Sequence, residues 1–120
     1  MDKPHKRLEV WKQSMELVLE AYRLTRSFPG EERFTLVPQM RRAAISVPSN
    51  IAEGAARQTT REFINFLHIA QGSLSELDTQ LELSLGLSYV TPKSLERIQN
   101  QMESIDKMLT GLLKSLQRSH

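Results

Sequence analysis

Residues 59–87 read TTREFINFLHIAQGSLSELDTQLELSLGL, and the spacing of the apolar side chains in this stretch decides the fold. Apolar residues recur at alternating intervals of four and three: Phe63, Leu67, Ala70, Leu74, Leu77 and Leu81. This spacing places them on one face of an α-helix, in a seam like that of a coiled coil. Thr59 and Glu62 have the spacing of a capping box, which satisfies free backbone N–H groups at a helix start. We therefore expect a helix over residues 60–87.

The end of the chain carries the same kind of seam and predicts a second long helix over residues 92–117. Its apolar residues recur at intervals of three and four: Leu95, Ile98, Met102, Ile105, Leu109, Leu112 and Leu116. Thr91 and Pro92 begin this helix, because threonine is a good N-cap and proline is favoured at the first helical position.

The first half of the chain contains two more amphipathic segments, which predict helices over residues 8–28 and 36–56. Pro29, which is followed by a glycine, ends the first of them. Pro48 lies inside the second, where it has no N–H to donate to the preceding turn. We expect a kink at Pro48, and the alternative is that the helix breaks and restarts there.

Connections of only a few residues join the four expected helices, and such connections force consecutive long helices to lie antiparallel. The sequence therefore predicts an all-α fold, an antiparallel up-down-up-down four-helix bundle with its second helix kinked at Pro48. Because no interior linker or repeat interrupts the pattern, we expect residues 1–120 to form a single domain.

The composition limits the environment of the protein. Of the 120 residues, 39% are apolar and 25% are charged, which is typical of a globular domain. No apolar run is long enough to span a membrane, and the first residues lack the apolar core of a signal peptide. We therefore expect a cytoplasmic protein with no membrane partner. Cysteine is absent, which excludes disulfides and thiolate metal ligands.

The sequence predicts no catalytic, cofactor-binding or metal-binding residues, and no cofactor. It lacks the glycine-rich phosphate loops and the Gly-x-Ser-x-Gly nucleophile motif. His68 has no carboxylate or second histidine three or four residues away along its helix. We therefore expect a protein that is not an enzyme. An enzyme with its substrate bound between subunits is the least supported alternative.

One polar stripe runs along the second expected helix and just past its end, at intervals of four, four, three and four residues: Arg42, Ser46, Asn50, Glu53 and Arg57. Three interpretations are open. The stripe is a solvated helix face, or it meets another subunit through hydrogen bonds from Asn50 and Glu53, or its arginines contact phosphates. In the last case the candidate nucleic-acid contacts are Arg41, Arg42, Arg57 and Arg61.

The charge is distributed unevenly along the chain. Residues 1–61 carry a net charge of +4, whereas residues 62–120 carry −2. A positive first half favours an anionic partner, although a dedicated nucleic-acid binder is usually more basic than a chain of net charge +2.

Two of the expected helices carry more apolar surface than a single bundle covers. On residues 8–28 a second stripe lies about 100° from the first, and it comprises Val10, Leu17, Ala21, Leu24 and Phe28. On residues 60–87 a flank about 100° from the seam mixes apolar and polar side chains, namely Phe66, Ile69, Leu87, Ser73, Glu76 and Gln80. Exposed apolar surface of this extent usually marks an interface.

We therefore expect a homo-oligomer. The apolar side chains expected at its interface are Leu17, Leu24, Phe28, Phe66 and Ile69. The polar side chains expected there are Ser46, Asn50, Glu53 and Glu76.

The nonapeptide SVPSNIAEG at residues 46–54, followed by Arg57, resembles the signature of a family of bacterial four-helix-bundle proteins named for 23S rRNA intervening sequences. The similarity continues from residue 8 to about residue 85, with Trp11 and Glu76 among the matching positions. The last expected helix matches only in its pattern.

This resemblance implies an antiparallel bundle that assembles into a ring-like homopentamer. A related branch, the accessory variability proteins of diversity-generating retroelements, looks similar in fold and binds nucleic acid and a reverse transcriptase through a basic surface. The family supplies no catalytic residues. The leading hypothesis is a non-enzymatic oligomeric scaffold that binds RNA or DNA. The alternative is a protein–protein interaction module that forms a homo-oligomeric ring and binds no nucleic acid.

Overall fold

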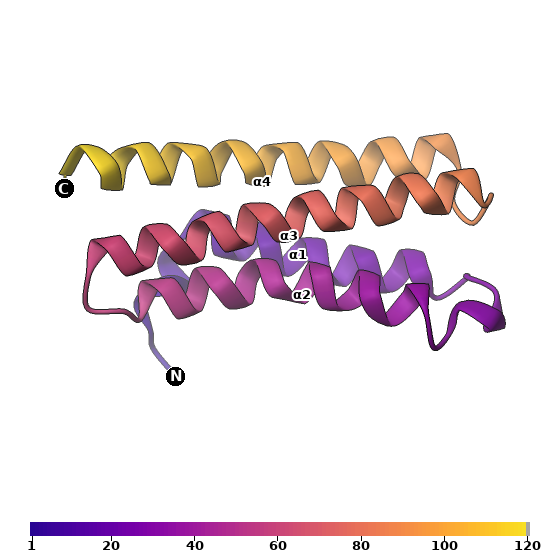
Figure 1. Ribbon diagram of the computed structural model, residues 1–120, viewed down its shortest axis with the longest axis horizontal. Coiled ribbons are helices and arrows are strands. Elements are labelled where there is room, and N and C mark those ends of the chain that lie inside the picture. The colour runs from indigo at the N-terminus through magenta and orange to yellow at the C-terminus, as the bar shows by residue number, and fades with distance from the viewer. Residues whose placement is uncertain (120) are drawn as a thin grey trace.

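The computed structural model describes residues 1–119, and over this range every regular element is a helix (Figure 1). The four long helices are α1 (Glu9–Thr25), α2 (Leu36–Ala55), α3 (Thr60–Gly86) and α4 (Pro92–Ser119). Two short 3-10 helices, η1 (Pro4–Arg7) and η2 (Gly30–Glu32), precede and follow α1. The prediction of an all-α four-helix bundle is confirmed.

Hydrogen bonds between α3 and α4 show how these two helices are oriented. Gln71, in the first half of α3, donates to Asp106 in the second half of α4, at 3.2 Å. Gln99, near the start of α4, donates to Asp78 further along α3, at 3.0 Å. The two helices therefore run in opposite directions. Figure 1 shows each helix returning along the one before it, and α4 also packs against α1, which closes the bundle.

Apolar side chains from all four helices form one core. The largest fully buried aliphatic side chains are Leu17, Met40, Val47, Ile51, Leu67, Leu77, Leu81, Ile98, Ile105 and Leu109. Burial of each such side chain contributes roughly 1.5–3 kcal/mol relative to leaving it in water. The predicted seams of α3 and α4 supply more than half of this set, because their periodicity matches the helical repeat.

The first helix ends earlier than its pattern predicts. Apolar periodicity predicts helix to residue 28, whereas α1 ends at Thr25. The hydroxyl of Thr25 donates to the carbonyl of Ala21 at 2.8 Å, and the backbone N–H of Phe28 donates to the carbonyl of Thr25 at 3.2 Å. Phe28 therefore lies in the turn after the helix, where its buried ring meets Tyr89 at 5.2 Å between ring centroids.

The apolar stripe of α1 that was expected at an interface mainly faces the core. Leu17 is fully buried and Phe28 is buried, so the expectation that these two side chains face a second subunit is wrong. Leu24 is half-buried against the core, and its place at an interface stays a prediction. The other stripe, which includes Trp11 and Met15, lies beside α2 at the edge of the bundle and stays partly exposed. Which of the two stripes stays exposed depends on where α2 and α4 pack, and the periodicity of α1 does not specify this.

Pro48 lies inside one continuous helix. The helix α2 runs from Leu36 to Ala55 through Pro48, so it does not break and restart there. Proline removes one hydrogen bond from the helix interior, and the buried ring of Pro48 packs in the bundle instead. The expected kink at this residue stays a prediction.

The predicted capping residues begin α3 and α4. The backbone N–H of Glu62 donates to Thr59 Oγ1 at 3.2 Å, and that hydroxyl donates to the Glu62 carboxylate at 2.8 Å. The backbone N–H of Ser94 donates to Thr91 Oγ1 at 3.1 Å. Such caps typically contribute about 1 kcal/mol each, and here they fix where the two longest helices start.

Gly54 allows α2 and α3 to approach closely near their connection. A Cβ atom at this position would lie 2.8 Å from Phe66 Cβ and 3.3 Å from the carbonyl oxygen of Phe63. The first distance is shorter than carbon atoms tolerate, so any side chain would push the two helices apart. By contrast, Gly111 on α4 has open space where a Cβ would be.

A tether joins the α1–α2 connection to the α3–α4 connection. The hydroxyl of Tyr89 donates to Glu32 Oε2 at 2.7 Å, and the hydroxyl of Thr35 donates to Glu32 Oε1 at 2.7 Å. These two bonds, Thr35 first and then Tyr89, lower the pKa of the Glu32 carboxyl. The bond to Glu32 is also the main cause that raises the pKa of Tyr89 to about 12.

Gly54→Ala should lower the free energy of unfolding by about 1–3 kcal/mol, the usual cost of overpacking, as measured by urea denaturation. The matched control is Gly111→Ala, which should raise that free energy by up to about 1 kcal/mol because alanine is the better helix former. A Gly54→Ala protein as stable as wild type would show that α2 and α3 do not depend on this contact.

Glu32→Gln should move the pKa of Tyr89 from about 12 toward the ordinary value of 10.0. Because the folded pKa is raised, the tether's contribution to stability is present below pH 10.0 and is lost as the pH rises toward 12. Phenolate absorbance would follow the titration in a Tyr22→Phe background, in which Tyr89 is the one remaining tyrosine. Equal midpoints with and without the Glu32 carboxylate would contradict the tether.

Candidate functional site

Most of the predicted polar stripe of α2, from Ser46 onward, lies on the side where α2 meets α3, whereas Arg42 at its start lines a hollow beside α1. Ser46 Oγ and Ser73 Oγ are 2.7 Å apart and form a hydrogen bond across the two helices. Asn50 Nδ2 donates to the carbonyl of Ser46 at 2.7 Å and to its hydroxyl at 2.8 Å. These side chains therefore use much of their hydrogen-bonding capacity inside the chain, where they hold α2 against α3.

Glu53 and Arg57 continue the stripe as an ion pair. Their side chains are 2.6 Å apart, and both are substantially exposed. The guanidinium of Arg57 also lies 4.9 Å from the ring centroid of the half-buried Phe66 on α3. An exposed pair of this kind contributes a few tenths of a kcal/mol. The guanidinium of Arg57 is therefore already engaged within its own chain, by Glu53 and by the ring of Phe66, which makes it less available to a phosphate.

Beside the stripe, α3 presents a row of exposed side chains at seven-residue intervals, which we call the α3 ridge: Ile69, Glu76 and Leu83. Ile69 is 49% exposed and Leu83 is 54% exposed. Over residues 1–119 the carboxylate of Glu76 takes part in none of the ion pairs. Ile69 and Glu76 belong to the predicted interface. Leu83 does not, although its spacing from them is visible in the sequence.

The four predicted phosphate contacts do not form one surface. Arg41 and Arg42 lie in the first half of α2, whereas Arg57 and Arg61 flank the connection from α2 to α3. Fourteen residues of helix separate Arg41 from the end of α2 at Ala55, which corresponds to about 21 Å, and Arg57 lies beyond that end. The structure therefore brings together two of the four arginines at each end of α2 and corrects the expectation of a single set.

Arg41 and Arg42 are joined by two arginines that the sequence did not single out. Arg26 and Arg33 come from the connection between α1 and α2, and with Arg41 and Arg42 they line two adjoining hollows, of about 460 and 340 Å³. No acidic side chain lines either hollow. We call these four residues the arginine cluster. No helical spacing relates Arg26 and Arg33 to α2, so the fold alone assembles the cluster.

The position of Arg41 within the cluster is fixed by α1. Its Nε donates to the buried hydroxyl of Thr25 at 3.0 Å, and its guanidinium lies 4.3 Å from the ring centroid of Tyr22. Arg41 is half-buried, whereas Arg42 is exposed. The guanidinium of Arg33 lies 5.9 Å from the ring centroid of the exposed Phe34. The cluster thus has one half-buried arginine held by α1, and three exposed arginines around it.

The groove between α1 and α2 continues from the arginine cluster into a hollow of about 360 Å³ with mostly apolar walls, which include Trp11, Met15, Val18, Ile45, Pro48 and Ala52. Ile45 also lines the neighbouring hollow of the cluster, so the two are continuous. We call the arginine cluster and this apolar hollow together the α1–α2 groove. It is apolar at one end and cationic at the other.

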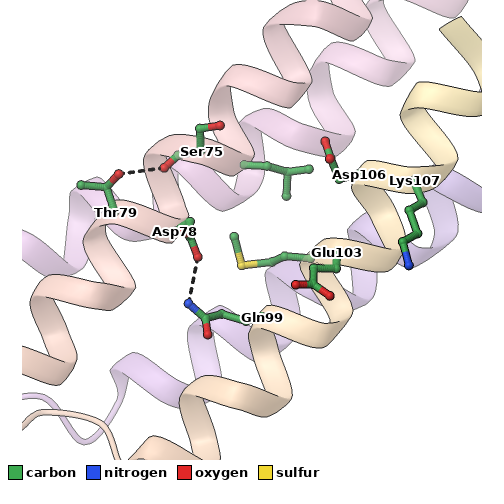
Figure 2. A pocket seen from close by; sticks show the side chains of 9 residues that line it. Ser75, Asp78, Thr79, Gln99, Glu103, Asp106 and Lys107 are labelled. Atoms are coloured by element: carbon green, nitrogen blue, oxygen red, sulfur yellow. Dashed lines mark hydrogen bonds between the residues drawn. The ribbon is translucent and has the colours of Figure 1, made fainter.

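A hollow of about 550 Å³ lies between the other two helices, α3 and α4 (Figure 2). The charged side chains that line it are mainly acidic: Asp78, Glu103, Asp106 and Lys107. Gln99 Nε2 donates to Asp78 at 3.0 Å and to Glu82 at 2.7 Å, so one amide bridges two carboxylates. The two long grooves of the bundle therefore carry opposite charge.

Across residues 1–119 no three histidine, aspartate or glutamate side chains are grouped so that they could hold a metal ion. Over the same range no helix is both long enough and apolar enough to cross a membrane. An apolar groove that ends in four arginines fits a surface that is partly apolar and partly anionic.

The chain is similar to a protein family and to solved structures. The family described as 23S rRNA-intervening sequence protein matches this chain over residues 6–111. Among solved structures, the chain is similar to a protein with unknown function from the S23 ribosomal protein family of Bacteroides thetaiotaomicron VPI-5482. The two are 30% identical, the match covers 88% of this chain and 95% of that chain, and the TM-score is 0.81. No curated protein is significantly similar to the chain.

Proposed function

Since the chain belongs to the 23S rRNA-intervening sequence protein family, we propose that it acts as a homo-oligomeric scaffold that binds nucleic acid and catalyses no reaction. The observation that carries this proposal is uncovered apolar surface on a chain that already has a complete core. That surface lies in the α1–α2 groove and on the α3 ridge.

The case for assembly depends on how much apolar surface stays in water. Seven large apolar side chains other than that of Met1 are exposed: Met15, Leu19, Phe34, Ile45, Ile69, Leu83 and Leu87. Several of them are grouped: Met15 and Ile45 line the α1–α2 groove, and Ile69 and Leu83 form the α3 ridge. Grouped apolar surface of this kind usually marks an interface. The family resemblance implies a ring, and we propose a pentamer on that ground.

The case for nucleic acid depends on the arginine cluster. Four guanidinium groups with no acid between them are suited to phosphate oxygens, which arginine binds with paired N–H groups. A ring repeats the cluster once per subunit, so a chain of modest net charge still presents an extended positive surface. RNA and DNA both supply the required phosphates.

A ring that binds another protein and no nucleic acid is the second candidate. The observation that favours it is the apolar end of the α1–α2 groove, where Trp11, Met15 and Pro48 offer contacts to side chains rather than to phosphates. Under this candidate, the assembly is the same and nucleic acid is not retained at moderate salt.

Light scattering should give a molar mass of about five times the 13.8 kDa of one chain. Ile69→Glu combined with Leu83→Glu should lower the mass toward 13.8 kDa, because two carboxylates on the α3 ridge oppose burial of that surface. The control is Leu19→Glu, at a residue of α1 that is 51% exposed and lines none of the hollows of the groove, which should leave the mass unchanged. A wild-type protein that stays a single chain at high concentration would end the proposal.

Retention on single-stranded RNA or DNA should fall with rising salt. Each lost phosphate contact should reduce the slope of log affinity against log salt by roughly 0.7–0.9. Arg26→Ala combined with Arg33→Ala should weaken binding and flatten the slope. Arg57→Ala combined with Arg61→Ala removes the same charge at the other end of α2 and should have the smaller effect, since Arg57 is paired with Glu53. Binding that is indifferent to salt, or to the first pair of substitutions, would favour the protein-binding ring.

A further inference from the structure

The α3 ridge and the α1–α2 groove have the same spacing of chemical groups. Along the ridge, Ile69 and Glu76 are seven residues apart, which is about 10.5 Å on a helix. Along the groove, Met15 lines the apolar hollow and Tyr22 lines the arginine cluster, and these residues are also seven apart on α1. Both surfaces therefore change from apolar to charged over the same distance, and the two charges are opposite in sign.

We infer that the α3 ridge of one copy lies in the α1–α2 groove of the next copy, an inference that rests on the proposed homo-oligomer. In this arrangement Ile69 enters the hollow beside Met15, and the Glu76 carboxylate lies among the arginine cluster. Leu83, two helical turns further along, meets the end of the groove beside Phe28, where α1 has already ended. The partner is a second copy of this chain.

Charge and shape together favour this pairing. If two ridges met, Glu76 would face Glu76, and like charges placed together in an interface are strongly unfavourable. The hollow between α3 and α4 is also acidic, but it is concave like the α1–α2 groove and cannot enter it, whereas the ridge protrudes and carries a carboxylate. One carboxylate offsets one of the four arginine charges, so the cluster keeps a net positive charge.

The shape of the ridge fits the same arrangement. Gly72 lies between Ile69 and Glu76 on α3 and is exposed, and a Cβ built there meets nothing within 4 Å. Because glycine has no side chain, the surface of α3 protrudes less at Gly72 than beside it. The walls of a groove can therefore approach the helix closely at this point. Groove and ridge are different surfaces of one chain, so each copy offers one of each. Repetition of such a contact generates a closed ring or a filament.

The absence of cysteine from the natural chain allows a direct test. A Met15→Cys, Ile69→Cys protein, oxidised after assembly, should form a ladder of disulfide-linked multimers that collapses to one chain on reduction. Each single variant should stay unlinked by itself, and a mixture of the two single variants should give a linked heterodimer. The register control is Met15→Cys with Leu83→Cys, which places the thiols about 21 Å out of register and should not link.

Three results separate the possible failures. If wild type is a single chain by light scattering, the proposed homo-oligomer itself is wrong. If wild type assembles and the matched pair gives no ladder, or the out-of-register pair links equally well, the groove–ridge contact is wrong while the oligomer stands. Linking by either single variant alone indicates a symmetric contact and also overturns the inference. All three positions, Met15, Ile69 and Leu83, are exposed, so circular dichroism and the mass of the reduced proteins should match wild type.

Discussion

The close contact of α2 with α3 determines which surfaces this bundle presents. Gly54 leaves no room for a side chain against Phe63 and Phe66, and the hydrogen bond between Ser46 and Ser73 fixes the same two helices further along. Once α2 is held at this distance and rotation, its polar stripe faces outward along α3. The far side of α2 is then turned to α1, where it forms one wall of the α1–α2 groove. The residues of the family signature, 46–54, therefore serve mainly to pack α2 against α3, and their role in a binding surface is secondary.

Local sequence signals were sufficient for the long helices. The seams of α3 and α4 repeat for many turns with few exceptions, and Thr59 and Thr91 cap the helix starts in the predicted way. These features depend on residues three or four apart in the chain, so they do not require knowledge of the other helices. The flank of α3 beside the seam was expected to be left uncovered, and this is only partly correct, because Ile69 and Leu87 are exposed whereas Ser73 and Gln80 are buried.

The features that could not be predicted from the sequence depend on residues that are distant along the chain. On α1 two stripes have similar apolar content, and the positions of α2 and α4 decide that Leu17 is buried while Met15 is exposed. The arginine cluster has the same origin. Arg26 and Arg33 lie outside any helical pattern, and they join Arg41 because the connection between α1 and α2 folds back over the end of the groove. Spacing along a single helix grouped Arg42 with Arg57 instead, although most of the length of α2 lies between them and Arg57 is beyond its end.

The uneven charge of the sequence becomes an uneven charge in space because the bundle is built from consecutive helices. The positive first half forms α1, α2 and the arginine cluster, and the negative second half forms α3, α4 and the acidic hollow between them. Two copies repel each other when their positive α1–α2 sides meet, or when their negative α3–α4 sides meet. They attract each other when the α1–α2 side of one copy meets the α3–α4 side of the other. Coulomb interactions between exposed charges are screened over about 8 Å at physiological salt, so the charges act at close range. In the proposed assembly they would therefore set the orientation of neighbouring copies, and the apolar contact between groove and ridge would supply the affinity.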